Sequence, residues 1–139
     1  MKANELMIGD WLKHYNGTPM QVTKITTEHF ACAEKGGLNC CEYNNKCNKF
    51  EPIFITSEIL KKNGWIKSEL NLDFYCGNLK YKNYNIQIHN NQDSLNTNNK
   101  CLIHIETIYY EEISQLEITY IHQLQHTLKL CGIDKEIVV

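Results

Sequence analysis

Hydrophobic and polar residues alternate with a period of two through much of the first third of the chain, which indicates β-strands. Two such runs flank Asn16-Gly17, a dipeptide that favours a tight hairpin turn because both residues tolerate a positive φ. A two-residue loop would pair Trp11 with Val22 across the hairpin. Gly9 could instead form a bulge that shifts this register.

A second hairpin is expected around Gly36-Gly37, which again suits a turn. If the two glycines form the loop, Phe30 faces Tyr43 and Cys32 faces Cys41 on the neighbouring strand. A further short strand follows. Four or five short strands at this spacing predict a small barrel or a strongly bent antiparallel sheet.

The pattern changes to that of a short helix over residues 57–63. Thr56 is a suitable N-cap, and Ile55 before it can pack on Leu60 as a hydrophobic staple. Gly64 stands where a helix ends in the left-handed conformation.

Residues 120–131 form the second predicted helix, with Thr119 as its N-cap and Gly132 as its C-terminal stop. At about 100° per residue, His122 and His126 point away from the apolar residues of this helix and are expected to be solvent-exposed. The apolar stripe, which we expect to be buried, comprises Tyr120, Ile121, Leu124, Leu128 and Cys131.

The region between the two helices is predicted to be β-rich. Residues 84–89 and 103–106 alternate with period two, and the polar segment 90–99 between them has the composition of a loop. Residues 116–119 and 136–139 are candidates for further short strands.

Ile8-Gly9-Asp10-Trp11-Leu12, followed by a turn and by Val22-Thr23-Lys24-Ile25, resembles the opening of SH3-like small barrels. The predicted fold class is therefore α+β and rich in antiparallel strands. An SH3-like β unit at residues 1–55 precedes an α+β unit at residues 56–139, which has helices near 57–63 and 120–131. A length of 139 residues suits one compact domain containing both parts.

Composition disfavours nucleic acid as a partner. The 14 basic residues are all lysine, they are spread along the chain, and the net charge is −2. Arginine is the residue that makes most bidentate contacts to phosphate and guanine, so its absence weakens any case for specific DNA binding.

The seven cysteines are an odd number, so a complete disulfide framework would leave one thiol over. The first ten residues hold no apolar core of signal-peptide length, and no stretch approaches 18 apolar residues. We therefore expect a cytoplasmic protein with reduced thiols and no membrane span.

Three segments, residues 5–12, 51–65 and 120–126, resemble a group of small uncharacterised proteins encoded by phages and mobile elements of gut Bacteroidetes. They cover about a third of the chain. The resemblance implies a genomic setting, but no known catalytic residue, cofactor or partner.

Two groups of residues suggest metal binding. His122 and His126 have the i, i+4 spacing of a zinc metalloprotease helix, but Gln123 stands where the catalytic glutamate would be. The second group, Cys32, Cys40, Cys41 and Cys47, lacks the C-x2-C spacing of a zinc knuckle. Buried free thiols, a zinc site and a Cys32–Cys41 disulfide all remain open, with buried thiols favoured.

Aromatic residues in the β-rich part of the chain provide the binding candidates Trp11, Tyr15, Phe30 and Tyr43. Such residues can line a peptide-binding groove on a small barrel, although they can equally form its core. No phosphate-binding or serine-hydrolase motif is present. The sequence therefore favours a non-enzymatic accessory protein that acts through an unidentified protein partner, without a cofactor. The alternatives are an SH3-like nucleic-acid-binding module and a small zinc-dependent protein.

Overall fold

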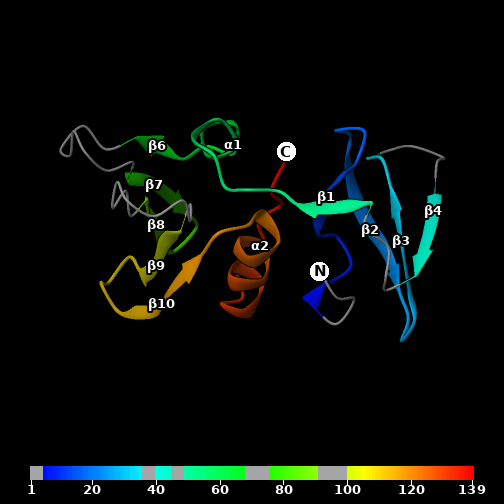
Figure 1. Cartoon of the computed structure of the whole chain (residues 1–139). Coiled ribbons are helices and arrows are strands. Elements are labelled where there is room, and N and C mark those ends of the chain that lie inside the picture. Colours follow the sequence, from blue (N-terminus) through cyan, green and yellow to red (C-terminus); the bar gives the residue numbers. More distant parts are fainter. Residues whose placement is uncertain (1–4, 36–39, 45–48, 68–75, 91–99) are drawn as a thin grey trace. The chain divides into compact units, whose positions relative to one another are not determined.

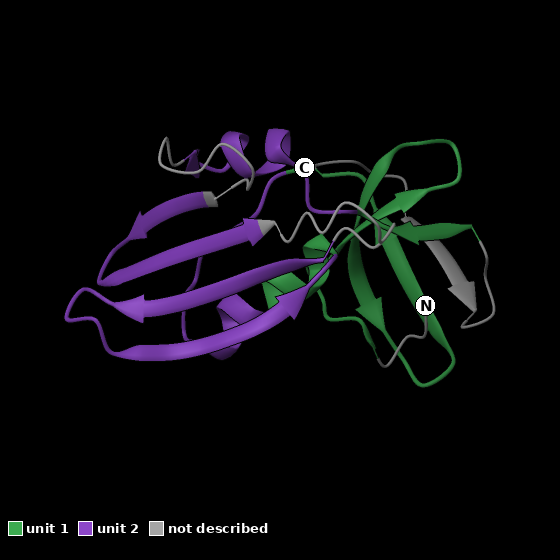
Figure 2. Cartoon of the chain, turned by 60° about the vertical axis from the view of Figure 1, so that its left-hand side comes forward, with its two compact units in different colours: residues 1–53, 120–126, 139 green, residues 54–119, 127–138 purple. Residues whose placement is uncertain are grey.

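A computed structural model confirms the α+β fold class, with two five-stranded antiparallel sheets and two helices among the residues that it describes (Figure 1). It describes residues 5–35, 40–44, 49–67, 76–90 and 100–139; for 40–44, Cys76 and Asn90 only the backbone is described. The chain divides into two compact units (Figure 2). Unit 1 contains residues 1–53, 120–126 and 139, and unit 2 contains residues 54–119 and 127–138.

Unit 1 holds the first sheet, in which the strands follow the order β4-β3-β2-β1-β5. Successive hairpins join β1 to β4, and β5 then returns to pair with the free side of β1. The strands are β1 (Trp11–His14), β2 (Pro19–Ile25), β3 (His29–Ala33), β4 (Cys40–Asn44) and β5 (Phe50–Pro52).

The β1–β2 hairpin forms where predicted, but its register differs by one residue. Trp11 pairs with Gln21 rather than with Val22. The loop is three residues long and ends at Gly17, whose φ is 91° and whose N–H donates to His14 O at 2.8 Å. A turn followed by a left-handed glycine is the usual three-residue hairpin loop, and its extra residue accounts for the shift.

The β3–β4 register is confirmed: Phe30 pairs with Tyr43, and Cys32 pairs with Cys41. Gly36-Gly37, the predicted loop, lies outside the described residues. Cys32 is buried and is not part of a disulfide, so the alternative of a Cys32–Cys41 disulfide is wrong.

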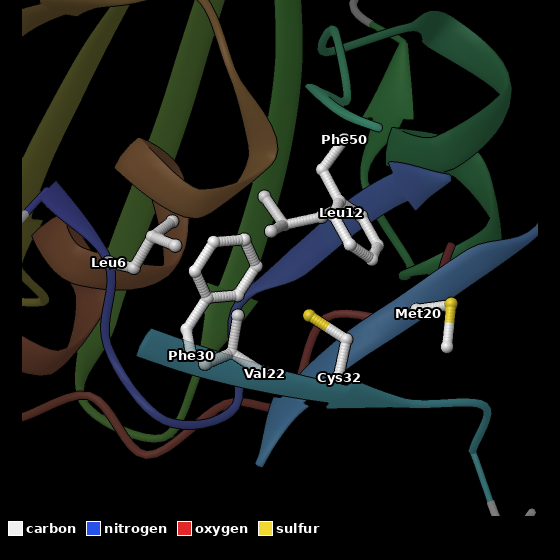
Figure 3. Packing of buried hydrophobic residues seen from close by; sticks show 7 residues of the cluster. All are labelled: Leu6, Leu12, Met20, Val22, Phe30, Cys32 and Phe50. Atoms are coloured by element: carbon white, nitrogen blue, oxygen red, sulfur yellow. The ribbon is translucent and has the colours of Figure 1, made fainter. Parts of the chain in front are cut away.

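The core of unit 1 lies on one face of this sheet, where seven buried side chains meet (Figure 3). The rings of Phe30 and Phe50 pack edge to face with their centroids 5.6 Å apart. The cluster contains Leu6, Leu12, Met20, Val22, Phe30, Cys32 and Phe50.

Unit 2 holds the second sheet, with the strand order β10-β9-β8-β7-β6. The strands predicted at 84–89 and 103–106 are confirmed, and the strand predicted at 116–119 belongs to a longer strand that begins at Glu112. The strands are β6 (Ile66–Lys67), β7 (Cys76–Tyr81), β8 (Tyr84–Asn90), β9 (Cys101–Thr107) and β10 (Glu112–Ile118).

The prediction of a strand at 136–139 is wrong. The side-chain amide of Asn63, rather than a neighbouring strand, bonds to the backbone of Val138. Val138 N–H donates to Asn63 Oδ1 at 2.8 Å, and Asn63 Nδ2 donates to Val138 O at 2.7 Å. These two bonds satisfy the backbone of Val138 without a neighbouring strand.

Helix α1 (Ser57–Lys62) is capped as predicted. The Thr56 hydroxyl accepts from Ile59 N–H at 3.3 Å. At the other end, Gly64 N–H donates to Lys61 O and Trp65 N–H to Leu60 O, both at 3.0 Å. This pair of bonds is the Schellman motif, and the φ of 87° at Gly64 makes it possible.

Helix α2 (Ile121–Leu130) ends with the same motif but begins differently from the prediction. Its N-cap is Tyr120 rather than Thr119, because Gln123 Oε1 accepts from Tyr120 N–H at 3.1 Å as in half of a capping box. The predicted burial of Leu124 and Leu128 is confirmed. Within the described part of the chain, no helix has the length and apolar character needed to cross a membrane.

Candidate functional site

The candidate site of unit 1 is built around Asp10, a buried carboxylate that directly precedes β1. Only 2% of the Asp10 surface is exposed. Asp10 closes a tight turn: its N–H donates to Met7 O at 3.1 Å, and its Oδ2 accepts from Met7 N–H at 2.7 Å. Gly9 occupies the third position of this turn with a φ of 95°, a conformation that suits glycine best. The turn therefore presents the carboxylate in a fixed direction.

His126 of α2 binds this carboxylate. Its Nε2 lies 2.8 Å from Asp10 Oδ2 and 3.0 Å from Asp10 Oδ1. An ionised carboxylate can only accept, so Nε2 is the donor in this contact. A carboxylate partner of this kind fixes the orientation of a histidine ring.

Gln125 holds the backbone on both sides of Asp10. Its Nε2 donates to Gly9 O at 3.0 Å, and its Oε1 accepts from Trp11 N–H at 3.2 Å. Gln21 of β2 adds a second donor to Gly9 O at 3.2 Å. These bonds fix the Asp10 turn against the first half of α2, so the Asp10–His126 pair is supported by two neighbouring amides.

His122 lies one helical turn before His126 and is 7% exposed. Its ring stacks on that of Tyr120, with centroids 5.6 Å apart and planes 10° apart, and meets the ring of His126 at 5.8 Å. Its Nδ1 is buried and has no hydrogen-bond partner in the described structure.

The same environment determines the charge of His122. Burial lowers the pKa of His122, and the Asp10 carboxylate opposes this effect. The neighbouring His126 lowers this pKa further, whereas Glu5 raises it. The net direction is downward, so His122 is a neutral imidazole at pH 7.

The expectation that His122 and His126 are both solvent-exposed is wrong. His122 is buried, and 23% of the His126 side chain is exposed. In the predicted apolar stripe of α2, Ile121, Leu124 and Leu128 are buried, whereas Tyr120 and Cys131 are half-buried. The Asp10 turn covers the histidines on the polar side of the helix. A buried carboxylate 116 residues away in sequence explains why a polar face is covered.

A pocket of about 600 Å³ opens beside this pair of histidines. It draws its lining from three segments that are far apart in sequence. Among the described residues, the lining has a carboxylate, two imidazoles, an amide, a phenol ring and a proline, but no lysine. The lining residues are Glu5, Pro52, Tyr120, His122, Gln123 and His126.

The aromatic binding candidates do not gather on one exposed surface. Trp11 and Phe30 are buried in the interior of unit 1. Tyr15 is exposed in the β1–β2 loop, where its ring lies 5.9 Å from Lys49 Nζ. The side chain of Tyr43 lies outside the described structure. The spacing of the histidine pair is visible in the sequence, whereas no periodic pattern marks Asp10.

The described cysteines have the properties of structural thiols. Burial raises the pKa of Cys101 to about 11, and burial also raises the pKa of Cys131, against an opposing hydrogen bond from Ser114. Thiols in this state carry little of the thiolate that nucleophilic attack requires. The side chains of Cys40, Cys41 and Cys47, which belong to the predicted cluster, lie outside the described residues.

The site therefore combines an imidazole held by a buried carboxylate with a pocket in which the Glu5 carboxylate can attract positive charge. No group of three or more histidine, cysteine or acidic side chains within the described residues is arranged to hold a metal ion. Comparisons with protein-family models, curated proteins and solved structures found no match to this chain.

Proposed function

We propose that the chain is a non-enzymatic accessory protein of a phage or mobile element, and that the pocket of unit 1 receives a lysine or arginine side chain of a partner protein. The observation that carries this proposal is the Asp10–His126 pair. It fixes the His126 ring in the lining of the same pocket to which Glu5 contributes a carboxylate.

The charges around the pocket support a cationic guest. Glu5 and Asp10 are acidic, His122 is held neutral by burial, and the lining residues that the structure describes include no lysine. An ammonium or guanidinium group has only donors, which match the carboxylate acceptor of Glu5. The Tyr120 ring adds an aromatic surface of the kind that attracts cations.

The same features disfavour nucleic acid, because among the described lining residues a phosphate would meet the Glu5 carboxylate and no lysine. The strand order of unit 1, in which β5 returns beside β1, supports an SH3-like description of its sheet. Domains of that class commonly bind protein segments, which is consistent with a peptide partner although fold alone does not establish one.

Four short peptides of the form acetyl-Gly-Gly-Xaa-Gly-Gly-amide, with Xaa as Lys, Arg, Glu or Leu, test this proposal. Amide NMR spectra of the full chain should shift at His122, Gln123 and His126 with the Lys or Arg peptide, and not with the Glu or Leu peptide. The expected affinity is low, with a Kd of order 1 mM, because one side chain provides few contacts.

Glu5→Gln should weaken binding of the basic peptide by about tenfold, the cost of losing one charged hydrogen bond. Glu51→Gln is the matched control, because Glu51 is an exposed acid of unit 1 that pairs with Lys13 at 3.4 Å and does not line the pocket. Equal binding of all four peptides, or equal weakening by both variants, would contradict the proposal.

A further inference from the structure

Unit 2 carries a second group of polar side chains, on the face of its sheet opposite the core. In an antiparallel ladder, residues directly opposite one another share a face. The register aligns Lys80, Asn85 and Glu106 in one row across β7, β8 and β9, and pairs Asn78 with Gln87 in the next row. We call these five residues the polar sheet face (the strands are labelled in Figure 1).

The polar sheet face borders a pocket of about 250 Å³. Three of its members are amides, which both donate and accept, and Asn85 Nδ2 donates to Glu106 Oε1 at 3.3 Å. Lys80 and Glu106 contribute one charge of each sign. The pocket is therefore rich in hydrogen-bonding groups but has little net charge among these five residues.

Tyr110 completes the lining from the β9–β10 turn. Its φ is 66°, which is costly for a bulky residue, and yet 81% of its surface is exposed. Burial of the ring therefore does not compensate for the backbone strain. The turn is held in place because Tyr110 N–H donates to Thr107 O at 3.0 Å, and Ile108 N–H donates to Asn83 O at 2.9 Å. Strain of this kind is often found where a side chain must be presented to a ligand.

We propose that this pocket is a binding site for a neutral carbohydrate, with the polar sheet face bonding its hydroxyl groups and the Tyr110 ring packing on its C–H face. Sugar hydroxyls donate and accept at once, as the amides of Asn78, Asn85 and Gln87 do. An exposed aromatic ring offers a flat apolar surface for the other side of the sugar.

Two other ligand classes fit less well. An extended peptide adds to a sheet edge, whereas this pocket lies over β7, β8 and β9, which are inner strands of the sheet. Among the described lining residues, a nucleotide phosphate would find Lys80 as the single basic side chain, with Glu106 beside it.

The experiment titrates the full chain with three soluble trisaccharides: maltotriose, cellotriose and triacetylchitotriose. NMR spectra of backbone and side-chain amides report the binding. At least one of the three should shift the side-chain amide signals of Asn78, Asn85 and Gln87 in a saturable way, with a Kd of order 1 mM. Failure of all three to shift these signals overturns the proposal.

Two neighbouring tyrosines provide the matched variants. Tyr110→Ala should weaken binding by about tenfold through loss of the ring contact, whereas Tyr109→Ala should leave it unchanged. Tyr109 is also exposed, at 78%, but does not line the pocket. Asn78→Ala, at an exposed position of β7, should weaken binding as Tyr110→Ala does. Equal weakening by the two tyrosine variants, or none by Tyr110→Ala and Asn78→Ala, also overturns it.

Discussion

The pocket lined by His122 and His126 in unit 1 and the polar sheet face of unit 2 are held together by different kinds of contact. The first depends on single long-range bonds, since His126 reaches a carboxylate 116 residues away. The second depends on regular strand pairing, which sets Asn85 opposite both Lys80 and Glu106. A site of the first kind should be sensitive to the loss of one side chain, whereas one of the second kind should tolerate such a loss without unfolding.

The largest effect is expected in the helix that carries the histidines. Leu128→Ala should lower the free energy of unfolding by about 2–5 kcal/mol, because the side chain is fully buried and its truncation leaves a cavity. Urea denaturation followed by circular dichroism measures this change. Leu130→Ala is the control, because Leu130 is exposed on the same helix and should cost no more than about 0.5 kcal/mol.

Asp10→Ala should be the next most harmful change, costing about 1–3 kcal/mol. It removes the acceptor of both Met7 N–H and His126 Nε2 in a buried setting. His126→Ala should also destabilise, and the double variant should cost less than the sum of the two single variants by at least about 0.5 kcal/mol.

His29→Ala serves as the control for this cycle, because His29 is exposed on β3. Additive costs for Asp10→Ala and His126→Ala would mean that the two side chains do not interact. In that case the Asp10–His126 contact would not stabilise the site of unit 1, and the two units would no longer differ in their sensitivity to the loss of one side chain.

Predictability from sequence follows the same division between local and long-range contacts. The helix ends were predictable, because a threonine N-cap and a glycine stop act within one turn of the residues that they cap. The β3–β4 register was predictable from the position of Gly36-Gly37. Thr119 was wrongly predicted as the N-cap of α2. The side chain of Gln123, inside the helix, instead accepts a hydrogen bond from the backbone N–H of Tyr120.

The candidate site was predictable only in part. The spacing of His122 and His126 indicated that two imidazoles are neighbours on a helix, but nothing in the sequence near them indicated the burial of Asp10. The start of β10 was missed because it is an edge strand whose residues are mostly exposed, so its hydrophobic alternation is poor.

The pH dependence of stability offers a subtler comparison of the two units. Burial lowers the pKa of His122 in unit 1, and burial together with His104 lowers that of His89 in unit 2. The unfolded chain therefore takes up protons that the folded chain does not, in the range below the ordinary histidine pKa of 6.5. Stability should fall as the pH drops below that value.

Urea denaturation at about pH 7.5 and about pH 5.5, on either side of the histidine pKa, measures this fall. His122→Leu and His89→Leu should each reduce the difference in stability between the two pH values, whereas His29→Ala should not change it. The effect of His122→Leu should be the larger, because His122 is the more deeply buried of the two rings. An unchanged difference in both leucine variants would contradict the assigned cause.

The smallest expected effect, and the only gain, is at Tyr110. Tyr110→Gly should raise the free energy of unfolding by about 0.5–1 kcal/mol, since it relieves a positive φ that costs a non-glycine residue about 1–2 kcal/mol, while glycine adds less than this to the entropy of the unfolded chain. The ring is exposed, so little burial is lost. Tyr109→Gly, at a position without a positive φ, should instead lower stability by about 0.5–1 kcal/mol.

The same Tyr110→Gly protein should lose the trisaccharide-dependent shifts even though it is more stable. Gain of stability with loss of binding would indicate that the strained turn is retained for presentation of the ring, as expected where function and stability are in conflict. If both glycine variants were destabilised equally, Tyr110 would not be strained. Its exposed ring would then need no functional explanation, and unit 1 would hold the one site supported by an unusual local structure.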